Sequence, residues 1–322
     1  MPTREDPSTV ASTTPRTLSP ITSARFEWQT WLVILAVYGS WLGLVLGYRD
    51  LPLWFSWPAL VIVTAWFMSL QHELLHGHPT PSKAFNRLLG LAPLSAWYPY
   101  DIYRDSHLDH HRDQLLTTPG LDPESNYVQA EVYARMNGWQ RFRLWALRTV
   151  VGRFLVGPGV TIPAVWSDLF ADVRKRGWAW VNTWVVHLAW LVLMLWWLYT
   201  ACGVHPAFYL LGVAYPALGL AMLRSFNEHR PAAAPQQRTV VNEAAWPWQL
   251  LFLNNNFHAV HHDMPSLAWY LIPAVYRSNR DAYLDGNGHY LMPGYCHVIA
   301  RYAFKPVDSP IHPGCGHEVA PP

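Results

Sequence analysis

Residues 53–76, LWFSWPALVIVTAWFMSLQHELLH, carry a long apolar run that ends in two histidines four positions apart. The run is close to the roughly 20 residues that a helix needs to cross a bilayer core of about 30 Å. Three more stretches share this length and character, at residues 28–48, 181–201 and 206–226. Together with residues 53–72 they predict an all-α, polytopic membrane protein with four spans. The short gaps within each pair predict two transmembrane helical hairpins.

The composition supports a membrane protein. Of the 322 residues, 51% are hydrophobic and 15% aromatic, while 14% are charged, against the roughly 25% charged residues of ordinary soluble domains. A large soluble enzyme is the weaker alternative. The formal net charge of +2 gives no support for binding nucleic acid.

The positive charges predict the orientation of the spans. Of the 23 lysines and arginines, 22 fall before the first hairpin, between the hairpins or after the second. The remaining one, Arg49, lies in a short hairpin turn. Because short loops rich in lysine and arginine stay in the cytoplasm, we expect the segments outside the hairpins to form a cytosolic helical cap.

The rest of the chain divides into three parts. Residues 1–27 are rich in Ser, Thr and Pro and predict a disordered tail, residues 28–302 a membrane domain, and residues 303–322 an irregular tail rich in Pro and Gly. Residues 85–100 and 139–166 are apolar but interrupted by Arg, Gly and Pro. They are typical of interfacial helices. The alternative is that one of these two stretches crosses the membrane as a further span.

Nine of the sixteen histidines form a pattern. They are His72 and His76 in HELLH (the first box), His107, His110 and His111 in HLDHH (the second box), His229 in NEHR, and His258, His261 and His262 in HAVHH (the third box). On a helix, these spacings let each box aim its imidazoles at one point. With two hairpins, all nine histidines reach the same face of the membrane.

Nine imidazoles predict a site for two metal ions, because one catalytic zinc takes three protein ligands and one structural zinc takes four. Imidazole binds Fe, Zn, Cu and Ni, so the ligands by themselves leave the metal open. Cys202, Cys296 and Cys315 show no CxxC spacing, which predicts neither disulfides nor an iron–sulfur site. Any electrons must therefore come from another protein.

The ordered motifs HxxxH, HxxHH and HxxHH, together with the two hairpins, resemble the membrane-bound fatty acid desaturase superfamily, which includes related hydroxylases and alkane monooxygenases. The resemblance extends from about residue 28 to residue 295. It implies two non-heme iron ions on the cytosolic face, dioxygen as co-substrate, and a lipid acyl chain lying between the helices. His229 lies where such proteins carry an additional ligand ahead of the last box.

The resemblance favours desaturation of a lipid acyl chain. Hydroxylation of a lipid, alkane-like or carotenoid substrate by the same diiron centre is the alternative, because the two outcomes differ only in how the substrate is placed. Either reaction needs an external electron donor of the ferredoxin, rubredoxin or cytochrome type.

The first box, HELLH, also matches the HExxH signature of zinc metalloproteases, in which the glutamate acts as general base. An intramembrane protease would explain the spans and this box. It would leave seven of the nine patterned histidines without a role.

Carboxylates beside the boxes are candidates to accept the second imidazole N–H and so orient the metal ligands. These candidates are Glu73, Asp109, Asp113, Glu228 and Asp263. Asn254 and Asn255, just before the third box, are candidates to hold a metal-bound water, with turn or cap chemistry as the alternative. Asp122 and Glu124 also follow the second box, but capping of a helix is the expected role for carboxylates in such a position.

Overall fold

The computed structural model describes residues 26–314, apart from the side chains of Asp113 and residues 170–176. Residues 1–25 of the predicted N-terminal tail and residues 315–322 of the predicted C-terminal tail therefore fall outside the described residues. The protein is mostly helical, as predicted. Its α-helices are α1 (Trp28–Leu46), α2 (Leu53–Leu75), α3 (Lys83–Gly90), α4 (Tyr100–His110), α5 (Ala130–Arg135), α6 (Gly138–Leu147), α7 (Val150–Trp197), α8 (Tyr215–Arg224), α9 (Trp246–Leu251), α10 (His258–Asp263), α11 (Ile272–Ser278), α12 (Arg280–Gly286) and α13 (Tyr295–Tyr302). Shorter 3₁₀ or π turns are η1 (Pro93–Ser95), η2 (Asp113–Leu115), η3 (Leu198–Cys202), η4 (Phe208–Ala214) and η5 (Pro235–Arg238), and the strands are β1 (Val241–Asn242) and β2 (Leu291–Met292).

Within the described residues, four helices are long and apolar enough to cross a membrane. They are α1, α2, the first part of α7 at Val150–Leu169, and the helix Gly177–Cys202, which joins the second part of α7 to η3. Gly177 separates the two parts and adopts φ 67°, a left-handed conformation that glycine reaches without steric cost.

The four helices with the length and apolarity of a span differ in one member from the four predicted spans. The predicted last span, residues 206–226, forms an apolar helix over Phe208–Arg224, which is shorter than the other four. The first part of α7 instead has the required length, because Pro158 and Pro163 lie inside a continuous helix. Residues 139–166 thus form α6 and most of the first part of α7, and whether this part of α7 lies at the interface or crosses the membrane stays a prediction.

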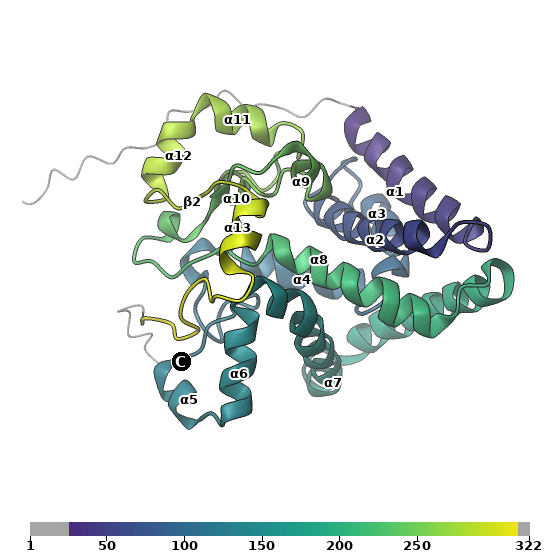
Figure 1. Ribbon diagram of the computed structural model, residues 1–322, viewed down its shortest axis with the longest axis horizontal. Helices are drawn as coiled ribbons and strands as arrows, with labels where there is room; N and C mark the ends of the chain where they lie inside the picture. The colour runs from purple at the N-terminus through teal and green to yellow at the C-terminus, as the bar shows by residue number, and fades with distance from the viewer. Residues whose placement is uncertain (1–25, 315–322) are drawn as a thin grey trace, which may run out of the picture.

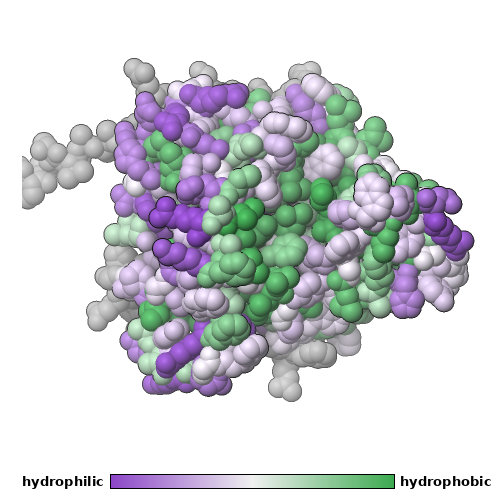
Figure 2. Space-filling view, viewed as in Figure 1, coloured by the Kyte–Doolittle hydropathy of each residue, from purple (hydrophilic) through white to green (hydrophobic). Residues whose placement is uncertain are grey.

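The bundle formed by α1, α2, α8 and the later part of α7 extends to one end of the molecule, away from α11 and α12 (Figure 1). Large apolar side chains on these helices face outward, among them Trp54 of α2 at 78% exposed and Trp196 of α7 at 64%. In Figure 2, apolar surface covers the middle of the molecule, with hydrophilic surface to either side. Exposed apolar surface of this extent is expected where helices face lipid.

Buried aromatic side chains join the two hairpins. Trp41 Nε1 of α1 donates to Tyr209 Oη at 2.9 Å, and the Tyr209 hydroxyl donates to the Leu94 carbonyl oxygen at 2.9 Å. Close packing continues between α7 and α8, where a Cβ on Gly219 would lie 2.4 Å from the Phe154 carbonyl oxygen. These contacts hold α1 against η4, and α7 against α8.

A short parallel strand pair positions the third box in the cap. β1 pairs with β2 through Val241 with Leu291 and Asn242 with Met292. The Ala259 N–H of α10 donates to the Val240 carbonyl oxygen at 3.0 Å. Because Val240 directly precedes β1, this bond ties α10 to the strand pair and fixes the direction in which its histidines point.

Candidate metal centre

The first box lies where α2 ends. His72 is in the last turn of α2, His76 follows as the C-cap residue, and Gly77 comes next with φ +102°. A glycine in the left-handed region is a common end of a helix. The helix therefore stops directly after it has placed His72 and His76 on one face, with ring centroids 4.8 Å apart.

Eight of the nine patterned histidines form two groups, each able to hold a metal ion. The first site consists of His72 and His76 of the first box, His107 of α4 and His261 of α10. The second site consists of His110 of α4, His229 after α8, and His258 and His262 of α10. Within each group, one ligand nitrogen from every ring lies within 4.8 Å of the others.

The ninth histidine, His111, lies against the first site. Its Nε2 atom is 3.0 Å from His107 Nε2 and 3.1 Å from His261 Nε2. The structure thus brings together all nine histidines that the sequence singled out. Four segments that are distant in sequence supply them: the end of α2, α4, the loop after α8, and α10.

Each HxxHH box divides its histidines between the two sites, which differs from the expectation that one box aims at one point. His107 and His111 face the first site, whereas His110 belongs to the second. At about 100° per residue, positions i and i+4 differ by roughly 40° around a helix, while i+3 lies roughly 60° from i on the other side. A box of this spacing can therefore serve two adjacent metal ions.

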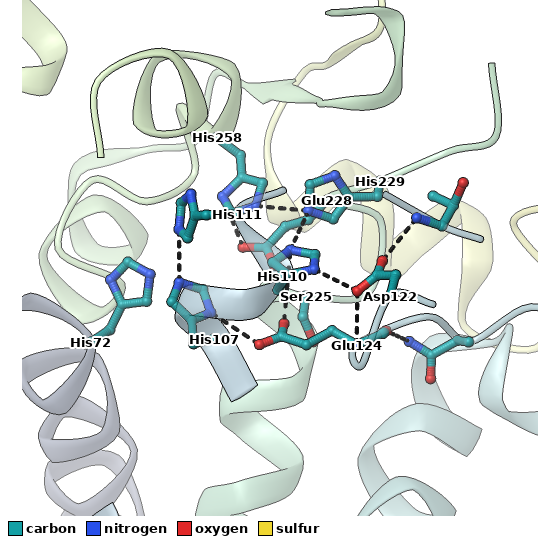
Figure 3. Close-up of polar contacts among 12 residues, drawn as sticks. His72, His107, His110, His111, Asp122, Glu124, Ser225, Glu228, His229 and His258 are labelled. Atoms are coloured by element: carbon teal, nitrogen blue, oxygen red, sulfur yellow. Dashed lines mark hydrogen bonds and ion pairs between the residues drawn. The ribbon is translucent and has the colours of Figure 1, made fainter. Parts of the chain in front are cut away.

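Carboxylates hold the two α4 histidines from outside the sites (Figure 3). His107 Nδ1 lies 2.9 Å from Glu124 Oε1, and His110 Nδ1 lies 2.8 Å from Asp122 Oδ1. Each Nδ1–H can donate to its carboxylate, which leaves the Nε2 lone pair directed into the site. In the second site, His110 Nε2 is 2.9 Å from His229 Nε2, and His258 Nε2 is 3.1 Å from it.

Asp122 and Glu124 are the site residues that the sequence analysis missed. They lie 12 and 17 positions after the histidines that they contact, so helical periodicity gives no signal. The expectation of helix capping was wrong for both, since Asp122 also accepts from the Thr117 N–H at 2.8 Å and closes a loop. Two carboxylates soon after a histidine box would have been the only available hint.

Three of the candidate residues near the boxes lie beside the histidines. Asn255 Oδ1 is 3.0 Å from His258 Nδ1, and Glu228 Oε1 is 3.5 Å from the same nitrogen. Glu73 Oε1 is 3.9 Å from His72 Nδ1, while its other oxygen accepts from the Trp269 N–H at 3.3 Å.

Three others point elsewhere. Asp109 pairs with Arg112 at 2.7 Å, Asp263 accepts from the Tyr283 hydroxyl at 2.8 Å, and Asn254 Nδ2 donates to the Trp269 carbonyl oxygen at 2.9 Å. Asp109 lies between the box histidines in sequence but on another side of α4, and Asp263 lies at the end of α10. The side chain of Asp113 is outside those described.

Residues 307–312, here named the strap, fasten the loop that carries Asp122 and Glu124. The Val128 N–H donates to the Pro310 carbonyl oxygen at 3.0 Å, and the His312 N–H donates to the Val128 carbonyl oxygen at 2.9 Å. The Tyr127 hydroxyl donates to Asp308. This part of the chain is irregular, yet it is hydrogen-bonded to the segment that orients His107 and His110.

Deletion of residues 306–322 should therefore weaken metal binding about 10- to 100-fold, the effect usual for loss of partners that orient a ligand. Deletion of residues 315–322 is the matched control, because it leaves the strap in place. The measurement is iron retained per chain against increasing chelator, with circular dichroism to verify the helices. A strapless protein that holds iron as tightly as the control would contradict this role.

The electrostatics favour neutral imidazoles and a cation between them. Burial, and then the neighbouring imidazoles, lower the pKa of His258, His261 and His262 well below the ordinary value. These rings are neutral near pH 7, the form that binds metals. At His110, burial lowers the pKa, but Glu124 and Asp122 outweigh it and raise the pKa to about 9. The carboxylates thus favour positive charge at the second site, which a metal ion would supply.

The geometry fits metal ions. Two nitrogens that each lie about 2.1 Å from one ion are expected roughly 3 Å apart, close to the Nε2 separations of 2.9–3.1 Å seen here. His76 Nε2 is buried and has no hydrogen-bond partner within residues 26–314. A buried polar atom without a partner is costly, and coordination of a cation would satisfy it.

A cavity of about 790 Å³ adjoins the histidines, a volume within the range of about 300–1,000 Å³ usual for ligand pockets. Its apolar wall comes from Met68 of α2, Ile102 of α4, Val160, Ala164 and Val165 of α7, and Leu218, Ala221 and Met222 of α8. Asp122, Glu124 and His229 line its polar part. The cavity therefore extends from the bundle helices to His229 and to the two carboxylates that contact His107 and His110.

Apolar helices long enough to cross a membrane stand here beside two adjoining histidine groups, each able to hold a metal ion. A model of the fatty acid desaturase family matches residues 50–294, more than half of the chain. The chain belongs to the fatty acid desaturase family, whose members are oxidoreductases, and the family implies a lipid substrate. A search of curated proteins found no match to this chain.

Proposed function

We propose that this protein is an oxygen-dependent diiron enzyme that desaturates a lipid acyl chain. The observation that carries the proposal is the convergence of nine histidines on two adjoining sites beside a cavity with an apolar wall. The family supports a lipid as substrate. A zinc protease finds less support, because Glu73, the base of such a mechanism, is 3% exposed and accepts a backbone N–H.

Iron bound at the two sites would supply the activation of dioxygen that removal of hydrogen from an unactivated C–H bond requires. The protein's own residues do the positioning. Met68, Val160, Ala164 and Leu218 offer an apolar wall to the acyl chain, and Glu124 and Asp122 fix two of the ligand rings next to that cavity. Position matters, since a misplacement of about 1 Å can lower a rate roughly a hundredfold.

The balance of the reaction requires an external electron donor. Two carbons lose two hydrogen atoms, and dioxygen needs two more electrons and two protons to leave as two water molecules. We propose a ferredoxin, a rubredoxin or a cytochrome as the source. The distribution of lysine and arginine supports a metal centre on the cytoplasmic side, where such carriers are found.

Two measurements test the function. Anaerobically purified protein should contain about two iron ions per chain, as nine imidazoles suggest, whereas one zinc and no iron would support the protease. Expression in a host that lacks desaturases should yield lipids that are lighter by two hydrogen atoms, as seen by mass spectrometry. A product heavier by one oxygen atom would instead identify a hydroxylase that uses the same centre.

A further inference from the structure

A second pocket reaches the first site from another side. Its volume is about 400 Å³, and His76 and His111 form part of its wall. None of its lining residues lines the larger cavity. The two histidines are partly exposed, so here the edge of the metal centre lies next to solvent without a further layer of protein.

Helix α4 separates the two pockets. Tyr100, Arg104 and Leu108, spaced four residues apart, line the small pocket. Ile102 and Ser106, also four apart, line the large cavity. Residues at i and i+4 share one helix face, so opposite faces of α4 serve two different openings.

The small pocket has a basic lining. Lys83 and Arg87 of α3 and Arg104 of α4 line it, and among the described residues no carboxylate does. Asp101 lies beneath, with its side chain 10% exposed, and holds Arg87 at 2.6 Å and Arg104 at 2.7 Å. The exposed Asp105 also pairs with Arg104 at 2.7 Å. Lys83 is exposed and has no hydrogen-bond or ion-pair partner within residues 26–314. A metal ion at the first site would add positive charge beside this pocket.

The surface around the pocket combines apolar and charged groups. Leu108 is 45% exposed in its lining, whereas Leu74 and Leu75 at the end of α2 form its buried floor at 2% and 8% exposed. An apolar centre surrounded by charged side chains is the usual composition of a protein interface. Transient redox complexes use small interfaces of this kind, and complementary charge accelerates their formation.

We propose that this small pocket and its rim of Lys83, Arg87 and Arg104 form the docking site of an acidic one-electron carrier protein. The inference rests on the proposed function, which requires two electrons from outside in each turnover. The carrier would be oxidised twice, one electron at a time, and each electron would enter through the exposed edges of His76 and His111. Substrate would occupy the larger cavity on the other side of α4, so the two do not compete for space.

The test measures binding of an acidic plant-type ferredoxin to the iron-loaded, full-length protein in nanodiscs of neutral phosphatidylcholine. Lys83→Glu should weaken binding about tenfold at low ionic strength, with Lys83→Gln between it and the wild type, and added salt should reduce the differences. Arg277→Glu, an equal change of charge at an exposed position on α11, is the matched control and should change affinity less than about twofold. Iron content should be the same in all four proteins.

Equal affinity of Lys83→Glu and the wild type would overturn the proposal, as would an equal loss in Lys83→Glu and Arg277→Glu. A third result would also overturn the proposal: Lys83→Glu no longer binds phosphatidylglycerol vesicles but still binds ferredoxin. That result would identify a site for a lipid head group. Product formation by chemically reduced wild-type enzyme is measured separately. Its failure would refute the proposed desaturation without changing the result of the ferredoxin binding assay.

Discussion

Replacement of His261 by alanine should remove the metal ion from the first site and lower activity by more than about a hundredfold. Removal of a residue that merely orients a metal ligand lowers affinity or activity by up to about a hundredfold. The loss should be larger here, because His261 is itself one of the potential ligands. Its Nε2 atom lies 3.1 Å from His111 Nε2, and the side chain is 1% exposed. The measurements are iron per chain and product per iron.

The apolar helices should persist in this variant, because His261 lies on α10, outside the bundle. Circular dichroism of the purified variant checks this. His297→Ala is the matched control, since His297 is exposed on α13 and belongs to neither site. A His261→Ala protein with full iron content and full activity would refute the assignment of His261 as a ligand.

Replacement of Glu124 by alanine should lower metal affinity about 10- to 100-fold. Glu124 accepts from His107 Nδ1 at 2.9 Å and lies 4.0 Å from His110 Nε2 through its other oxygen. Its loss frees the ring of His107 and removes negative charge from beside both sites. Glu124→Gln should lose less, because the amide oxygen can still accept the hydrogen bond.

The measurement for Glu124 is the chelator concentration at which half of the iron is lost. Glu131→Gln is the control, an exposed carboxylate on α5 whose neutralisation should have no effect. If Glu124→Ala and Glu124→Gln both kept wild-type affinity, the carboxylate would have no part in holding His107.

The apolar bundle and the nine histidines could be predicted because both are local patterns. A run of about 20 apolar residues predicts a span by itself, and HELLH at the end of such a run must emerge at an end of the helix. The length of the helix at residues 150–169 was not expected, because Gly and Pro near residues 152–163 suggested a break. Pro158 and Pro163 are accommodated within the first part of α7, as proline can be in apolar helices.

The surroundings of the metal centre could not be predicted in the same way. Asp122 and Glu124 act through a loop whose shape depends on residues 307–312, nearly 200 positions later. Hydrogen bonds between such distant segments follow from the folded chain, since no periodicity relates the partners. The same holds for Asp109 and Asp263, which lie beside box histidines in sequence but contact Arg112 and Tyr283.

The sequence by itself determined which side chains gather and at which end of the apolar helices, because helical spacing and hydrophobic length act within one segment. Only the tertiary structure decided how the histidines divide between two sites, which carboxylates orient them, and that opposite faces of α4 border two separate pockets. These features depend on the angles at which distant segments pack, and packing angles are set by contacts between segments rather than within them.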